Sequence, residues 1–82
     1  MNQADRTADS LPARLKMRAE LNVDGDYKYV GTAYAGTATS VAKWRIKLMT
    51  YDVNKRLTAI DFADGSAEFD KVWNNRATYS YS

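Results

Sequence analysis

The chain has 82 residues, carries 12 Lys and Arg against 10 Asp and Glu, and contains neither cysteine nor histidine. This length suits one small domain, and the missing residue types exclude disulfides, thiolate zinc sites and catalysis through a histidine base. Because small domains with a thin core usually need additional support, we expect it to come from oligomerisation or from docking on a larger assembly.

Residues 1–10 are polar, with no large apolar side chain after Met1, and we interpret them as a flexible N-terminal arm. They lack the apolar segment of a signal peptide. No stretch of the chain approaches the roughly 18 apolar residues of a membrane span, so no membrane partner is expected. We expect residues 11–82 to form a single β-rich domain.

Residues 14–23 alternate between apolar and polar side chains, and this period of two predicts a half-buried strand. A helix that starts at Ser10, with Pro12 in its first turn, is the alternative. Asp24 and Gly25 predict a hairpin turn, and residues 27–35 then form the next expected strand. Gly31 interrupts that strand, which indicates a bulge or a close backbone approach.

The small and hydroxyl-bearing residues 36–40 are typical of a loop. Gly31 and Gly36 have the spacing of a phosphate-binding loop, but the lysine that such a loop needs is absent, which excludes nucleotide binding here. Residues 41–51 and 57–63 are expected to form a second hairpin. In its first strand Trp44 lies on one face, and Arg45 and Lys47 on the other.

From Phe69 the spacing of apolar residues changes to that of a helix, which we expect over residues 66–76 with Ser66 as its N-cap. Residues 77–82 alternate again and predict a last short strand. The predicted fold is mainly β: a small antiparallel β-sandwich or barrel of about five strands, with one short helix near the C-terminus. The expected core consists of Trp44, Ile46, Leu48, Phe62, Phe69 and Trp73.

Catalytic and metal-binding patterns are not supported. Four acidic side chains between residues 61 and 70 miss the ligand spacing of an EF-hand, and no carboxylate pair is marked for glycoside hydrolysis. We therefore expect no enzyme activity, no cofactor, no metal and no small-molecule substrate.

Aromatic residues are frequent, and tyrosine is enriched at protein interfaces. Basic residues interleaved with aromatics are also typical of OB-like proteins that bind single-stranded nucleic acid. Trp44 is predicted on the face opposite Arg45 and Lys47, so nucleic acid is kept as an alternative and is not the expected partner. The candidate interface residues are Tyr27, Tyr29, Tyr34, Gly36, Tyr79 and Tyr81.

Two stretches resemble a pattern found in small proteins of tailed bacteriophages. The first is YVGTAYAGTATS at residues 29–40, followed by AKWRIK at 42–47. The second is ADG at 63–65, followed by FDKVWNNRA at 69–77 and the final YS. The chain departs from this pattern at Tyr34 and Ala35, where smaller residues, and often a proline before the glycine, are usual.

The resemblance implies a structural component of the virion, in the head, neck, tail or fibre region, made in the host cytoplasm. It implies no catalysis and no cofactor. The expected partners are further copies of the chain and other virion structural proteins.

Overall fold

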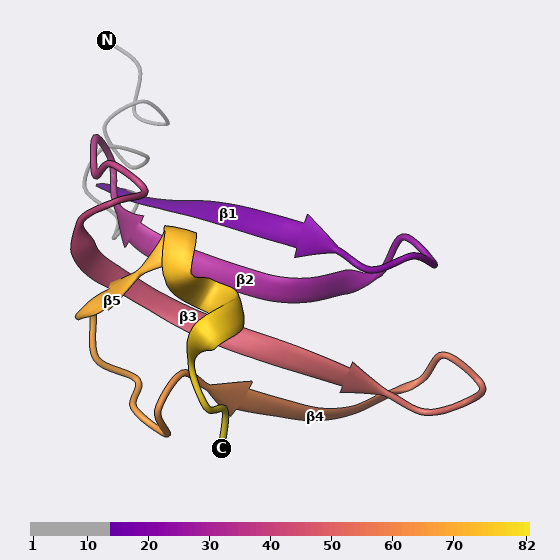
Figure 1. Cartoon of the computed structure of the whole chain (residues 1–82). Helices are drawn as coiled ribbons and strands as arrows, with labels where there is room; N and C mark the ends of the chain where they lie inside the picture. The colour runs from indigo at the N-terminus through magenta and orange to yellow at the C-terminus, as the bar shows by residue number, and fades with distance from the viewer. Residues whose placement is uncertain (1–13) are drawn as a thin grey trace, which may run out of the picture.

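The computed structural model describes residues 14–82, so the arm predicted over residues 1–10 lies outside the described residues. The described chain contains five strands and one 3₁₀ helix (Figure 1). They are β1 (Leu15–Leu21), β2 (Tyr27–Tyr34), β3 (Ala42–Tyr51), β4 (Leu57–Phe62), β5 (Lys71–Val72) and η2 (Trp73–Thr78).

The strands form one antiparallel sheet in the order β1-β2-β3-β4. The short β5 also pairs with β3, at Ala42 and Trp44, beyond the segment from Lys47 to Tyr51 that pairs with β4. Among the described strands β1 pairs only with β2, so the sheet stays open. The prediction of a mainly β, antiparallel domain with about five strands and a short C-terminal helix is confirmed.

The two hairpins turn in the same way. In the β1–β2 turn the Asn22 side-chain oxygen accepts hydrogen bonds from the backbone N–H groups of Asp24 and Asp26, at 2.9 and 3.0 Å. In the β3–β4 turn the Asp52 carboxylate accepts them from Asn54 and Arg56, at 2.8 and 3.0 Å. Where each strand ends, hydrogen bonds from the following backbone N–H groups to a short side chain take the place of the ladder hydrogen bonds between strands.

One face of the sheet, here called the inner face, is covered by η2 and by the segment that follows it (Figure 1). Trp44 and Ile46 of β3 are fully buried there, and the Trp44 indole lies 5.8 Å from that of Trp73, between ring centroids. Tyr79 and Tyr81 pack against the same cluster. The second layer of this domain is therefore a helix and a C-terminal segment.

Gly31 allows this layer to approach the sheet. A Cβ atom at this position would lie 2.5 Å from Cε3 of Trp73 and 3.1 Å from Cε3 of Trp44. A side chain would thus occupy the space that the two indoles need. The interruption of the strand pattern at Gly31 reflects this close approach.

The helix predicted over residues 66–76 begins later. Lys71 and Val72 pair with β3 in an extended conformation, so η2 starts only at Trp73 and runs as a 3₁₀ helix to Thr78. Ser66 does not cap it; its Oγ accepts a hydrogen bond from the backbone N–H of Glu68 at 3.1 Å. The strand predicted over residues 77–82 is reduced to an isolated bridge between Ala63 and Tyr81.

The expected core also needs correction at two aromatic residues. Phe62 is paired with Lys47 and therefore lies on the opposite, outer face, half-buried, while its neighbour Ala63 is fully buried. Phe69 precedes β5 and packs against Tyr34, with ring centroids 6.2 Å apart. The C-terminal segment lies so close to β4 that the small Ala63 fits beneath it and Phe62 does not, whereas Phe69 is displaced because Lys71 and Val72 pair with β3.

Candidate functional site

The candidate interface residues lie in three separate places. Tyr27 and Tyr34 are exposed at opposite ends of β2, and Gly36 lies in the turn that follows, with a φ of 91°. Tyr29, in contrast, is buried in the inner cluster, because the register sets it opposite Leu48. The remaining two, Tyr79 and Tyr81, are partly buried against that cluster.

The inner tyrosines have structural hydrogen bonds. The Tyr79 hydroxyl accepts a hydrogen bond from the backbone N–H of Val72 at 2.8 Å, and the Tyr81 hydroxyl donates one to the carbonyl of Arg76 at 2.7 Å. Burial, with a smaller contribution from nearby Tyr29, raises the pKa of Tyr81 well above its usual range. The Tyr79 hydroxyl thus ties the C-terminal segment to β5, and the Tyr81 hydroxyl holds the end of that segment against η2.

The outer face of the sheet carries apolar side chains that η2 does not cover. The register sets Met17 opposite Thr32 and Ile60 opposite Met49, on the face away from Trp44. Met17 is 59% exposed and Ile60 is 46% exposed. The alternating apolar stripe of β1, which was expected to be half-buried, therefore borders the solvent on the uncovered face.

Aromatic and basic groups also meet on the outer face. The Arg45 guanidinium lies 5.0 Å from the centre of the Phe69 ring, and the Tyr34 ring centre lies 6.2 Å from it. Lys47 shares the face, two residues along β3. Arg45 Nε is buried and has no hydrogen-bond partner among the described residues. The separation of cations from aromatics that was predicted for Trp44 thus does not hold for Phe69 and Tyr34.

The inner side of β1 is polar. Lys16 Nζ donates a hydrogen bond to the carbonyl of Thr37 at 2.7 Å and lies 5.4 Å from the centre of the Trp44 ring system. The Glu20 carboxylate accepts a hydrogen bond from Arg76 Nε at 2.7 Å. Lys16 thus ties β1 to the β2–β3 loop and Glu20 ties it to η2, while the apolar side chains of β1 lie on the outer face.

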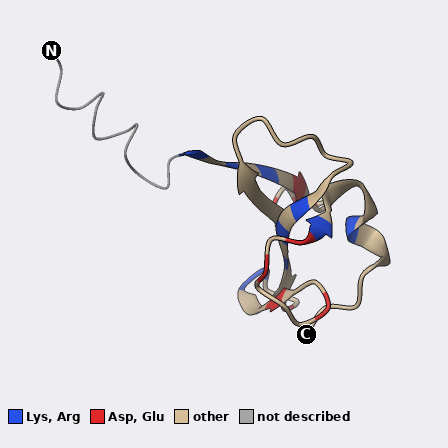
Figure 2. Cartoon of the chain, turned by 90° about the vertical axis from the view of Figure 1, so that its left-hand side faces the viewer, with Lys and Arg blue, Asp and Glu red and all other residues tan. Residues whose placement is uncertain are grey.

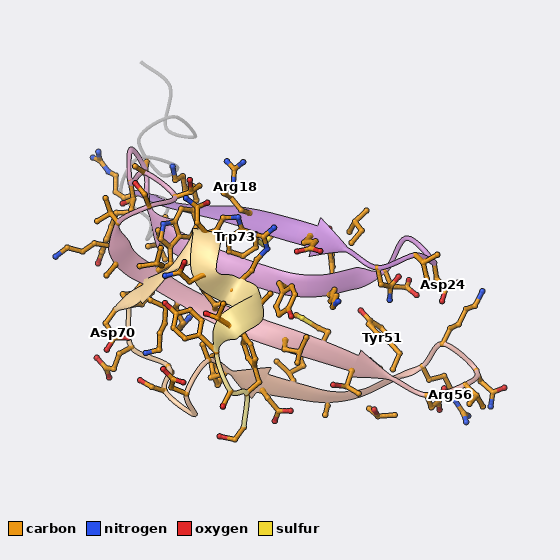
Figure 3. All side chains as sticks on the ribbon, viewed as in Figure 1. Arg18, Asp24, Tyr51, Arg56, Asp70 and Trp73 are labelled. Carbon is orange, nitrogen blue, oxygen red and sulfur yellow. The ribbon has the colours of Figure 1, made fainter. Side chains whose placement is uncertain are left out.

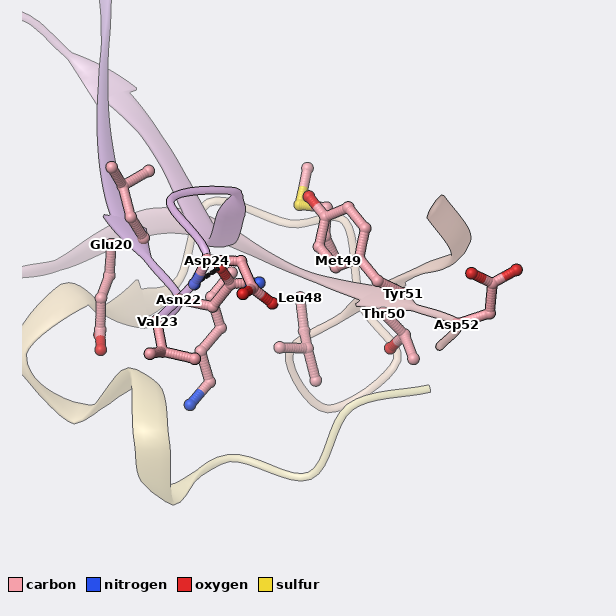
Figure 4. A pocket seen from close by; sticks show the side chains of 11 residues that line it. Glu20, Asn22, Val23, Asp24, Leu48, Met49, Thr50, Tyr51 and Asp52 are labelled. Atoms are coloured by element: carbon pink, nitrogen blue, oxygen red, sulfur yellow. Dashed lines mark hydrogen bonds between the residues drawn. The ribbon is translucent and has the colours of Figure 1, made fainter. Parts of the chain in front are cut away.

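A groove opens between the two hairpins at the turn end of the sheet (Figure 4). The strands β2 and β3 pair only from Tyr29 to Thr32. Between Tyr29 and the turns, no ladder therefore joins the two hairpins. The groove has a volume of about 640 Å³. Two contacts join the hairpins at this end of the sheet: Lys55 Nζ lies 3.5 Å from Asp24 Oδ1, and the Tyr51 hydroxyl donates a hydrogen bond to the Tyr27 carbonyl at 2.7 Å.

The acidic groups around the groove are already engaged. Asp52 accepts hydrogen bonds from the backbone and side chain of Arg56 and the backbone of Asn54, and the largest of these, from the Arg56 backbone, lowers the pKa of Asp52. Asp24 pairs with Lys55. Asp24 and Asp52 are therefore each paired with a basic side chain of the β3–β4 turn.

Most of the described Lys and Arg residues lie on strands, whereas most of the described Asp and Glu residues lie in turns and loops (Figure 2). Lys71 is buried beside β3, and its hydrogen bond and ion pair with Asp70 raise its pKa. Within residues 14–82 no group of three acidic side chains is placed to hold a metal ion. The same residues contain no helix long and apolar enough to cross a membrane.

No protein-family model, curated protein or solved structure matches the chain. The two sequence stretches at residues 29–47 and 63–82 include Gly31, Trp44, Ala63 and Trp73, which build the inner face.

Proposed function

We propose that the chain is a non-enzymatic structural component of a tailed-phage virion that acts by homo-oligomeric assembly or by docking on other virion proteins. The observation that carries this proposal is the uncovered outer face, where the apolar side chains of the edge strands β1 and β4 lie. Apolar surface of this kind is typical of a chain that completes its burial against a neighbour.

The small number of buried hydrophobic residues supports this interpretation. Seven hydrophobic residues are buried within the described chain, whereas the exposed large hydrophobic residues include Met17, Leu21, Tyr34 and Ile60. A partner that covers the outer face would bury these side chains as well. Because such binding stabilises only the folded state, assembly would add the stability that the thin core does not supply.

The phage assignment is supported by the bacteriophage-like pattern alone. That pattern includes Gly31, Trp44 and Trp73, whose packing defines the inner face. The resemblance to the phage proteins therefore concerns residues that build the fold more than residues that form a contact surface.

Sedimentation velocity over a range of protein concentrations tests the assembly. We expect a species heavier than one chain that grows with concentration. Immunodetection in density-purified phage particles tests the location, with the soluble fraction of the lysate as control. A single-chain mass at every concentration, together with absence from the particles, would contradict the proposal.

A second candidate is binding of single-stranded nucleic acid on the outer face. It is favoured by the contact of Arg45 with Phe69 and by the nearby Tyr34 and Lys47, since stacking platforms combine aromatic and basic side chains. Fluorescence anisotropy with a labelled oligothymidylate at low salt tests it. Lys47→Glu should weaken binding, and Lys55→Glu, which makes the same charge change in the turn, should not. No binding at micromolar protein eliminates this candidate.

A further inference from the structure

The two edges of the sheet are not equally protected. At β4 the backbone N–H and carbonyl of Phe62 exchange hydrogen bonds with Ser82, at 3.0 and 3.1 Å, so part of this edge is occupied. At β1 no residue of the described chain pairs with the edge that faces away from β2. Exposed edge strands present unpaired backbone groups that pair readily with another strand.

The direction of these backbone groups follows from one hydrogen bond. Arg14 accepts a hydrogen bond from the backbone N–H of Ala35 at 2.5 Å, so its carbonyl points towards β2. Because backbone groups alternate in direction along an antiparallel strand, those of Lys16, Arg18 and Glu20 also point towards β2. The N–H and carbonyl groups of Met17 and Ala19 therefore point to the open edge.

The sequence of β1 is complementary to itself in one antiparallel register. A two-fold axis at Ala19 sets Arg18 opposite Glu20 of the second copy, on both sides of the axis. It also sets Met17 opposite Leu21, which are 59% and 52% exposed. Opposite charges and apolar pairs directly across a ladder are stabilising.

Neighbouring registers bring like charges together. An axis at Arg18 sets the two copies of this residue against each other, and an axis at Met17 sets Lys16 against Arg18 twice. Like charges directly opposite each other destabilise a ladder. Charge therefore selects the register about Ala19, whose small side chain allows close contact.

We propose that two copies of the chain associate through β1, antiparallel about Ala19, and form one continuous sheet across the dimer. The inference rests on the proposed assembly function and names its contact surface. The pairing is isologous, the commonest kind in homo-oligomers, and it joins the apolar stripes of both outer faces. The larger apolar surface that results remains available to further virion proteins.

Both charged groups can take part. The Arg18 side chain is exposed and projects from β1 (Figure 3), and it has no ion pair with a described residue. Glu20 is 41% exposed and accepts from Arg76 through Oε1. A carboxylate has two acceptor oxygens, so its second oxygen is available to Arg18 of the other copy.

Ala19→Pro tests the backbone pairing. Proline removes an N–H that points to the open edge and makes no bond within the described chain, so the fold should persist. Ile60→Pro is the matched control, because the backbone groups of Ile60 point away from β3, as those of Phe62 do. We expect sedimentation velocity to show single chains for Ala19→Pro and dimers for Ile60→Pro, with native circular dichroism in both.

A charge exchange tests the register without proline. Arg18→Glu sets Glu against Glu20 of the second copy, and Glu20→Arg sets Arg18 against Arg, so each variant alone should dimerise roughly tenfold or more weakly. Mixed in equal amounts, they should form a heterodimer in which every cross-strand pair is again of opposite charge. Native mass spectrometry distinguishes the heterodimer by its mass.

The outcomes separate the inference from the proposed function. Dimers that persist in Ala19→Pro, or variants that fail to recover on mixing, overturn the β1 pairing while assembly itself stands. A wild-type chain that stays single at hundreds of micromolar also overturns the pairing. If that chain is nevertheless found in purified particles, its virion role holds through docking on other proteins.

Discussion

The inner and outer faces of the sheet are built from the same strands but hold the chain together in different ways. The inner face buries Trp44 and Ile46 under Trp73, which in turn lies against Gly31. The outer face exposes Met17 and Ile60. Stability of the described residues therefore resides mainly on the inner face, whereas the outer face has apolar surface that no element within residues 14–82 covers.

The largest expected effect is on the inner face. Trp44→Ala removes a fully buried indole and should lower the free energy of unfolding by about 4 kcal/mol, enough to unfold much of a domain of this size. Tyr34→Ala, a large truncation on the outer face, is the control and should cost far less. Urea unfolding followed by tryptophan fluorescence measures both. Equal losses would remove the distinction between the faces.

Gly31→Ala should cause the next largest loss of stability. The added methyl group would lie within 2.7 Å of two atoms of the Trp73 ring, so η2 has to move, at a cost of about 2 kcal/mol. Thr32→Ala, the neighbouring change on the outer face, provides the comparison. Thermal unfolding by circular dichroism gives the difference, and an unchanged midpoint for Gly31→Ala would show that the indoles are not closely packed.

Alkaline pH should weaken the inner face selectively. The pKa of Tyr81 is raised by burial and that of Lys71 by its hydrogen bond with Asp70, so both hold their protons more tightly in the folded state. At neutral pH both groups are protonated in the folded and the unfolded state, so a small change in pH there leaves stability unchanged. It falls as the pH rises above about 10, where the unfolded groups lose their protons, by up to about 1.4 kcal/mol per pH unit for each group.

Urea unfolding between pH 8 and pH 11.5 tests this prediction. Tyr81→Phe should flatten the decline, because it removes one of the two groups. A stability that is constant up to pH 11.5 in the wild-type chain would contradict the assignment.

The smallest effect on stability is expected on the outer face. Ile60→Ser replaces a half-exposed side chain and should change the free energy of unfolding by less than about 0.5 kcal/mol. It should nevertheless reduce binding of a hydrophobic dye, because it shortens the apolar stripe. A large loss of stability would indicate that the outer face is part of the core.

The sequence predicts where the strands and turns lie better than it predicts which face of each strand is covered. Asn22 and Asp52 begin turns because their side chains hydrogen-bond the backbone locally, and such signals lie within a few residues. The period-two pattern of β1 is equally plain. It does not tell which molecule covers the apolar stripe, and in the single chain the polar stripe with Lys16 faces the covering layer.

The C-terminal region was harder to predict because long-range contacts override its local pattern. Phe69 and Trp73 have helical spacing, yet β5 forms between them because Lys71 and Val72 pair with β3. The same pairing moves Phe69 to the outer face. Tyr29 was expected at an interface and lies in the core, since its position depends on a register that only tertiary packing sets.

The covering layer comes from the last part of the chain, and this has a consequence for biosynthesis. Both hairpins contain only local contacts and can form early, whereas Arg76 meets Glu20 across 56 positions of the sequence. Until the segment beginning at Lys71 has left the ribosome, Trp44 and Ile46 lack the cover that Trp73, Tyr79 and Tyr81 give them. A nascent chain stalled before this point would present two apolar faces at once, making it a substrate for chaperones during translation.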